Sequence, residues 1–380
     1  MRIQKEVSNR IEMLRFLMIF GVVILHVPQY VPLNEMGGTW FGFAKGFCQH
    51  ALFRSTVPVL TLISGYLLFN SALHVAPLNL WKKKLHSLAI PFLVFNLIVL
   101  GVAYIAQAKL GFTMSYDLLK ADAGTWLDAM FGVTNSPINY PLNFLRDMMM
   151  LMLLAPLFGL LLRTAPLAGF ILVTLLFYNN FDGPVVLRDT MAILFYVGGL
   201  CATQKWDLCA LDKYAKPLLL GFLVLCFFMV NMKIANRTQF VLLAPFLIWP
   251  AASLFVDTRL GAWAVKHSKY SFFIFIAHAP LLMLSWWAYG KVAGYIPYQL
   301  YWAATPFMTV LALMLAHELG MRLAPTAFAF VTGARVRKNA VFVERRKAPR
   351  APNAPVYSQE MRRQLARSWE TEVESLRSQH

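Results

Sequence analysis

Residues 15–26 read Arg15-Phe-Leu-Met-Ile-Phe-Gly-Val-Val-Ile-Leu-His26, a continuous apolar run between two ionisable side chains. The run has no alternation of apolar and polar residues, which favours a buried helix over a half-exposed strand. Eleven steps of about 100° bring Arg15 and His26 onto one stripe of that helix, about 16 Å apart along its axis. Ionisable groups in such a segment are costly, and each is therefore a candidate for function.

The rest of the chain has the same apolar character. Of its 380 residues 58% are apolar and only 14% are charged, whereas in a soluble domain about a quarter of all residues are charged. The net charge of +17 is spread between and beyond the apolar blocks. The composition excludes an ordinary cytosolic enzyme, a disordered chain and a nucleic-acid-binding domain, and it predicts an all-α polytopic membrane protein with no nucleic acid partner.

A membrane-spanning helix needs about 20 apolar residues. Ten stretches approach this length, at residues 11–28, 51–70, 88–108, 142–162, 166–181, 185–203, 216–232, 238–256, 270–290 and 298–321. With ten spans, most of the 35 lysines and arginines fall on the side of the N-terminus. The positive-inside rule then predicts that both termini are cytoplasmic. We expect a transmembrane domain over residues 1–330 and a basic cytoplasmic tail over residues 331–380.

The second predicted span carries a charge near its start. Running inward, it places Arg54 at about the depth of His26, and we favour a functional role for this arginine. Pro58 removes a backbone donor and predicts a kink that frees carbonyl groups. Ser64 and Gly65 are small residues that let a neighbouring helix approach closely, and we favour packing for this pair.

These motifs resemble a known family. Arg15 and His26 at this spacing, followed by Arg54 and by the run Ser-Gly-Tyr66-Leu-Leu-Phe, resemble the acyltransferase-3 family. Two later stretches are similar as well, Asn143-Phe-Leu-Arg146-Asp147 and Phe-Ile-Phe-Ile-Ala-His278-Ala-Pro280. The resemblance covers about residues 8–323 and is greatest to exopolysaccharide succinyltransferases of the succinoglycan type. Many relatives have a second basic residue where this chain has Val57, so no role of that charge is carried over.

The resemblance implies an integral-membrane O-acyltransferase of the bacterial inner membrane. Such an enzyme transfers an acyl group, succinyl or acetyl, from cytoplasmic acyl-CoA to a hydroxyl of an exopolysaccharide or its lipid-linked precursor. No permanently bound cofactor is implied, because acyl-CoA is a donor substrate. The implied partners are the glycan acceptor, membrane lipids and proteins of polysaccharide synthesis and export.

The candidate residues suit this chemistry. An imidazole titrates near neutral pH, so His26 is the expected general base. Arg54 is expected to stabilise the oxyanion or to bind a distal carboxylate of the acyl group. CoA phosphates need cations, which Arg15 and the run of Lys82, Lys83 and Lys84, expected on the cytoplasmic side, can supply.

Other polar residues leave alternatives open. Arg146 and Asp147 suit substrate binding or the orientation of His26, and equally a simple pair at a helix end. Ser64 and Tyr66 are further candidate substrate contacts in the second span. His278 is expected either to line the cavity or to bond a carbonyl freed by Pro280. We predict no metal site, because the only dipeptide of the right kind, His317-Glu318, has no ligand at Met321.

A transporter or flippase for a glycan or lipid-linked sugar is the competing class, because it would use the same buried charges as a polar path. The sequence has no inverted repeat of the kind that many transporters show. A non-catalytic scaffold in an export complex would leave Arg15, His26 and Arg54 unexplained.

Overall fold

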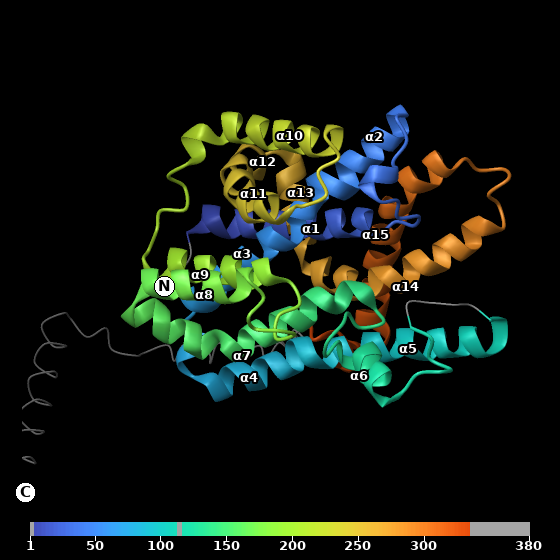
Figure 1. Cartoon of the computed structure of the whole chain (residues 1–380), viewed down its shortest axis with the longest axis horizontal. Helices are drawn as coiled ribbons and strands as arrows, with labels where there is room; N and C mark the ends of the chain where they lie inside the picture. Colours follow the sequence, from blue (N-terminus) through green and yellow to red (C-terminus); the bar gives the residue numbers. More distant parts are fainter. Residues whose placement is uncertain (1–3, 112–115, 335–380) are drawn as a thin grey trace, which may run out of the picture. The chain divides into compact units, whose positions relative to one another are not determined.

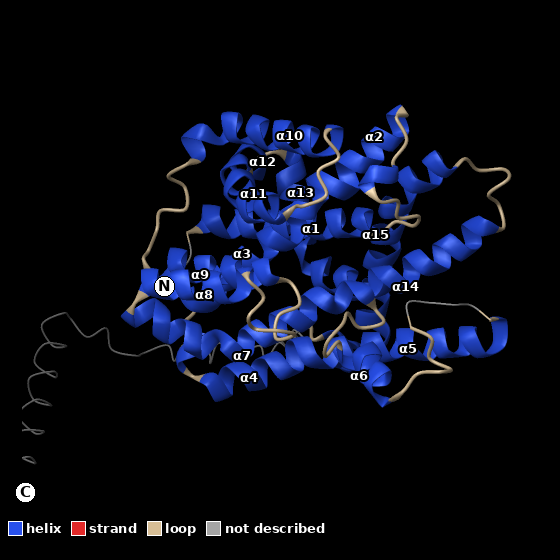
Figure 2. Cartoon of the chain, viewed as in Figure 1, coloured by secondary structure: helices blue, strands red, loops and turns tan. Residues whose placement is uncertain are grey.

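The computed structural model describes residues 4–111 and 116–334, and every regular element within them is a helix (Figure 2). The predicted tail lies outside the described residues from position 335 on. The α-helices are α1 (Lys5–Leu25), α2 (Trp40–Gly46), α3 (Thr56–Asn70), α4 (Pro77–Lys84), α5 (Ile90–Leu110), α6 (Ala123–Phe131), α7 (Asn143–Thr164), α8 (Pro166–Tyr178), α9 (Asp189–Thr203), α10 (Ala215–Asn231), α11 (Thr238–Ala251), α12 (Ser253–Val256), α13 (Arg259–His267), α14 (Ser271–Gly290), α15 (Tyr298–Leu323) and α16 (Pro325–Thr332).

Helices cover most of each of the ten predicted apolar stretches, which confirms the all-α class for the residues that the structure describes. Among the described residues, six helical runs are long and apolar enough to cross a membrane, namely Trp40–Asn70, Pro77–Lys109, Tyr140–Thr164, Asp212–Asn231, Arg259–Gly290 and Tyr298–Leu323. The helices α8, α9 and α11 are apolar but shorter. The count of ten spans and the side on which each terminus lies stay predictions.

Helix α1 occupies the interior of the described bundle. It contacts α3, α13, α14 and α15, and Figure 1 shows it between α10 on one side and α4, α5 and α7 on the other. Its side chains Phe16 and Val23 are 2% and 0% exposed. Burial of apolar side chains on several sides fixes α1 among its neighbours, so that both ends of its Arg15–His26 stripe have defined surroundings.

Helices α3 and α9 pack backbone against backbone. A Cβ atom on Gly65 would lie 2.1 Å from the carbonyl oxygen of Phe195, and one on Gly198 would lie 2.2 Å from that of Leu62. Neither position has room for a larger side chain. The predicted close approach at Gly65 is therefore present, and it brings α9 beside the helix that follows Arg54.

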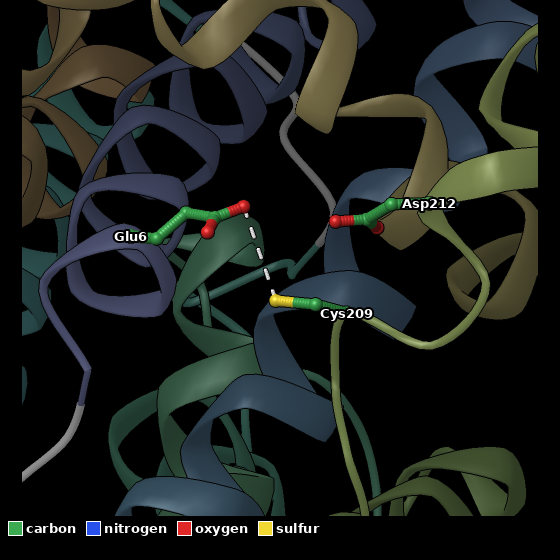
Figure 3. Close-up of side chains that lie close together, drawn as sticks. All are labelled: Glu6, Cys209 and Asp212. Atoms are coloured by element: carbon green, nitrogen blue, oxygen red, sulfur yellow. Dashed lines mark hydrogen bonds between the residues drawn. The ribbon is translucent and has the colours of Figure 1, made fainter.

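An ion-pair network holds the start of α1. The Arg10 side chain is 0% exposed and donates to both carboxylate oxygens of Asp212, at 2.8 and 2.6 Å, and to Glu6 at 2.9 Å. Glu6, Cys209 and Asp212 lie near one another in Figure 3. Because Arg10 compensates both carboxylates, we interpret this cluster as an anchor between α1 and the segment before α10.

Candidate active site

His26 lies where α1 ends, and one of its ring nitrogens is fully engaged. Its Nδ1 atom is 2.9 Å from the carbonyl oxygen of Val22, one turn back along α1, and 3.2 Å from Nε2 of His278. The two imidazole rings have their centroids 5.2 Å apart. Within the described residues, Nε2 of His26 has no hydrogen-bond partner.

The end of α1 is closed by a buried amide. Gln49 is 0% exposed, and its Nε2 donates to the carbonyl oxygens of Ile24 at 3.0 Å and Val27 at 3.2 Å. A helix end leaves carbonyl groups without intrahelical partners. Gln49 supplies the donor for the Val27 carbonyl and a second donor for the Ile24 carbonyl, which also accepts from the backbone N–H of Val27 at 3.3 Å. It thereby fixes the backbone on either side of His26.

His278 reaches His26 from α14 and is itself 0% exposed. Its Nδ1 atom lies 2.7 Å from the carbonyl oxygen of Phe275 and 3.2 Å from that of Ile274. The carbonyl that Pro280 leaves free is that of Ile276, four residues before it. The sequence left two alternatives open for His278, a place in the cavity lining or a bond to the carbonyl freed by Pro280. In the structure His278 bonds to the backbone, but through the carbonyl groups of Phe275 and Ile274.

We call the space beside His26 the His26 cavity. It has a volume of about 200 Å³, and its lining includes His26, Arg54, Tyr140, Phe144, Arg188 and Phe275 but no acidic residue. The irregular turn Leu52–Ser55 orients Arg54, whose Nε donates to the Gln49 carbonyl oxygen at 3.0 Å. Arg188 makes no hydrogen bond or salt bridge to any described residue. The cavity therefore presents guanidinium donors that the protein itself does not use.

A larger space, the Arg15 cavity, lies further along α1. Its volume is about 410 Å³, and Arg15, Ser64 and Lys84 are among the residues that line it. Lys82 and Lys83 are exposed on α4 and do not line this cavity. Two cations and the hydroxyl groups of three serines, Ser64, Ser71 and Ser271, thus share a space whose other walls are largely apolar.

Two phenylalanine rings stand between these cavities. Phe144 on α7 and Phe275 on α14 line both of them. Their ring centroids are 5.6 Å apart and the rings meet edge to face at 83°. The stripe from Arg15 to His26 therefore runs past this aromatic pair from one cavity to the other.

A third space, the Pro280 cavity, lies on the other side of His26. It has a volume of about 190 Å³ and shares His26, Tyr140 and Pro141 with the His26 cavity. The Tyr140 ring stands at 73° to that of His26, with centroids 5.6 Å apart. His26 thus lines two neighbouring spaces.

Arg146 and Asp147 lie away from the three cavities described above. The Arg146 guanidinium donates to four carbonyl oxygens, of Gly132, Val133, Pro184 and Val185, and to Asp147 at 3.1 Å. Asp147 also accepts from the backbone N–H of Leu187 at 3.0 Å. These bonds tie two loops to the start of α7, and Asp147 does not contact His26. Tyr66 lines a separate apolar cavity beside Trp249.

Sequence reasoning assigned no functional role to Gln49 or to Arg188. The signal for Gln49 is an amide five residues before Arg54 in a helical apolar run. The signal for Arg188 is a basic residue at the start of a predicted span, where capping is the commoner explanation. Only the folded chain shows that Gln49 bonds the end of α1 and that Arg188 lines the His26 cavity.

An all-helical chain with apolar helices of membrane-spanning length and a histidine between cavities fits a multi-pass membrane enzyme. The chain belongs to the acyltransferase-3 family, since residues 8–317 match the family's acyltransferase domain. It is 32% identical over 348 residues to the succinoglycan biosynthesis protein ExoH of Rhizobium meliloti (strain 1021). The aligned region covers 87% of this chain and 93% of that protein. No solved structure matches the chain.

Proposed function

We propose that the protein transfers an acyl group from acyl-CoA to a hydroxyl of an exopolysaccharide or its lipid-linked precursor. One observation carries this proposal, namely that Nδ1 of His26 is engaged by protein atoms while the ring lines a cavity with Arg54 and Arg188. An imidazole with one free nitrogen is a suitable base for a hydroxyl group. The name of the related protein, which refers to succinoglycan biosynthesis, supports a polysaccharide acceptor.

The chemistry follows from these groups. The acceptor hydroxyl oxygen attacks the thioester carbon while Nε2 of His26 takes the hydroxyl proton. Negative charge develops on the former carbonyl oxygen, where the Nη donors of Arg54 stabilise it. The tetrahedral intermediate then collapses, the C–S bond breaks, and the proton on His26 passes to the leaving thiolate. The products are the ester and free CoA, and His26 returns to its starting state.

The cavities provide separate routes for the two substrates. In this proposal the donor enters the Arg15 cavity from the cytoplasm, and Arg15 and Lys84 attract its phosphates. The pantetheine arm extends between Phe144 and Phe275 over the about 16 Å that separate Arg15 from His26 on the helix. The glycan hydroxyl approaches His26 from the Pro280 cavity. The inner membrane of a bacterium is the location that such a donor and acceptor require.

We further propose that the acyl group is succinyl. Arg54 and Arg188 line the His26 cavity together, and the lining contains no carboxylate to balance them. Asp147 interacts electrostatically with Arg188 but is bonded to Arg146. A donor that carries its own carboxylate supplies the missing negative charge, and a planar guanidinium binds a carboxylate through two parallel bonds.

The test uses purified protein in lipid vesicles with succinyl-CoA and an unmodified polysaccharide or lipid-linked repeat unit. We expect release of free CoA that depends on the acceptor, with the succinyl ester recovered on the glycan. His26→Ala should abolish transfer and leave the thermal unfolding temperature near that of the parent, whereas the exposed His86→Ala should behave as the parent protein. Movement of the acceptor across the vesicle without consumption of thioester would assign the protein to transport instead.

A further inference from the structure

We propose that His278 is a positioning residue that holds His26 as the tautomer with a free Nε2 and stabilises its protonated form. The expected effect of His278 on catalysis rests on the proposed function. The expected tautomer of His26 does not, because the tautomer is a property of the protein without substrate.

The protonation of His278 follows from its partners. Nδ1 faces the carbonyl oxygens of Phe275 and Ile274, and a carbonyl oxygen can only accept a hydrogen bond. Nδ1 of His278 must therefore carry a hydrogen. In a neutral imidazole the other nitrogen then has a lone pair, so Nε2 of His278 is an acceptor. The ring is 0% exposed, and such burial favours the neutral form.

The same reasoning then fixes His26. Its Nδ1 faces the carbonyl oxygen of Val22 and the acceptor Nε2 of His278, so this nitrogen carries a hydrogen that is shared between the two. In the neutral ring the lone pair is consequently on Nε2. The chain of bonds runs from the α14 backbone through His278 to His26, and it delivers the basic nitrogen that the proposed reaction needs.

Val22 alone does not replace His278. The Val22 carbonyl belongs to the same helix as His26 and offers one acceptor, whereas His278 approaches from α14 and restrains the ring from a second direction. When His26 takes the substrate proton, its Nδ1–H becomes a charged donor, and hydrogen bonds from charged donors are about twice as strong as neutral ones. The bond to His278 thus strengthens as the transition state forms, which is the condition for faster catalysis.

The surroundings also explain why an imidazole suits this position. In the serine hydrolases a carboxylate orients the catalytic histidine. Here the lining of the His26 cavity contains no acid, and Asp147, the candidate from the sequence, is bonded to Arg146 and Leu187. A neutral acceptor orients His26 without a negative charge that would compete for Arg54 and Arg188.

Three substitutions separate this role from packing. His278→Gln places an amide oxygen near the position of Nε2 and keeps an acceptor for His26. His278→Phe keeps a ring of similar size and removes the acceptor, and His278→Asn is too short to reach His26. Ser285→Ala, on the same helix, is the matched control. We expect kcat to fall about ten- to hundredfold in the Phe and Asn variants, as for loss of one hydrogen bond to a charged group. The KM for acyl-CoA should change little. The Gln variant should retain most of the parent kcat.

The deciding readout is the state of the His26 ring nitrogens, measured by ¹⁵N NMR on histidine-labelled protein without substrate. His26→Asn identifies the signals of His26. We expect Nδ1 to be protonated and Nε2 free in the parent, in Ser285→Ala and in His278→Gln, and a mixture of tautomers in His278→Phe. If Nε2 of His26 stays free in His278→Phe, the proposal is overturned even where kcat falls, because the loss then has a structural cause. If the parent protein transfers no acyl group, the proposed function fails while this measurement still decides the role of His278.

Discussion

The main-chain oxygen of Gln49 accepts a hydrogen bond from Nε of Arg54 at 3.0 Å, while the Gln49 side chain donates to the end of α1. One residue thus sets the backbone around His26 and the direction of the Arg54 guanidinium. It can do so because the helical run is irregular between Phe47 and Ser55, where a π turn and a 3₁₀ turn leave main-chain oxygens without their usual partners.

Gln49→Leu tests this coupling. The variant keeps the volume of the side chain but removes the Gln49 donor from the Val27 carbonyl, and it leaves the Ile24 carbonyl with only the backbone N–H of Val27, at 3.3 Å. We expect a loss of about 1–3 kcal/mol in the free energy of unfolding and a fall in kcat, measured by thermal unfolding in detergent and by CoA release. Gln239→Ala, an exposed glutamine on α11, is the control and should change neither quantity. Parent-like kcat in Gln49→Leu would show that Arg54 and His26 are held without it.

The aromatic boundary between the cavities makes a second prediction. Phe144→Trp adds bulk where the proposed route of the donor arm passes Phe275, so we expect kcat/KM for acyl-CoA to fall about tenfold or more, as for an overpacked site. Initial rates over a range of acyl-CoA concentrations measure it. Phe170→Trp, at a half-buried position on α8 outside both cavities, is the matched control. Equal rates in the two variants would place the route of the donor elsewhere.

The free guanidinium of Arg188 predicts donor selectivity. In Arg188→Gln we expect kcat/KM for succinyl-CoA to fall about ten- to hundredfold, the effect of one charge-assisted hydrogen bond. The kcat/KM for acetyl-CoA, which has no distal carboxylate, should change little. Arg188→Lys keeps the charge without the planar fork and should be intermediate, and the exposed Arg259→Gln serves as the control. An equal loss with both donors would instead assign Arg188 to the oxyanion or to CoA.

Much of this architecture is readable from the chain because long apolar runs leave few alternatives to a helix. The stripe from Arg15 to His26 follows from helical geometry alone, and in the structure the two residues line neighbouring cavities. The contact between His26 and His278 joins residues 252 positions apart. Such a pairing depends on how α14 packs against α1, and no local pattern encodes it.

For the polar residues too, the sequence predicts which side chains are unusual, and long-range packing decides what they contact. Arg146 and Asp147 stand out in the sequence as charges at the start of a span, yet which groups they bond is decided by two distant loops. Gln49 looks like an ordinary polar residue because its role arises from a break in regular helical bonding. Sequence reasoning thus finds polar and charged residues whose burial costs free energy, whereas packing decides which of them face a cavity.

One of these loops is held by a carboxylate outside the predicted spans. Asp128 at the end of α6 accepts hydrogen bonds from the backbone and hydroxyl of Thr134, both at 2.6 Å, and from the Asn135 amide side chain at 2.9 Å. The turn that it closes contains Gly132, whose carbonyl oxygen accepts from Arg146. Asp128 therefore supports the bonds that fix the start of α7.

This arrangement predicts how stability depends on pH. Burial acts to raise the pKa of Asp128, but the hydrogen bonds from Thr134 and Asn135 outweigh it and lower the pKa to about 2. An unfolded aspartate has a pKa of about 3.9. Because the folded value is the lower one, the carboxylate stabilises the fold fully above about pH 4, and this contribution is lost as the pH falls towards about 2.

Asp128→Asn should therefore lower the unfolding temperature at neutral pH, and the difference from the parent should shrink as the medium is acidified. Thermal unfolding in detergent across this range measures it, with Asp117→Asn, an exposed carboxylate of the same loop region, as the control. A difference that stays constant with pH would mean that the ionised form of Asp128 does not support the turn.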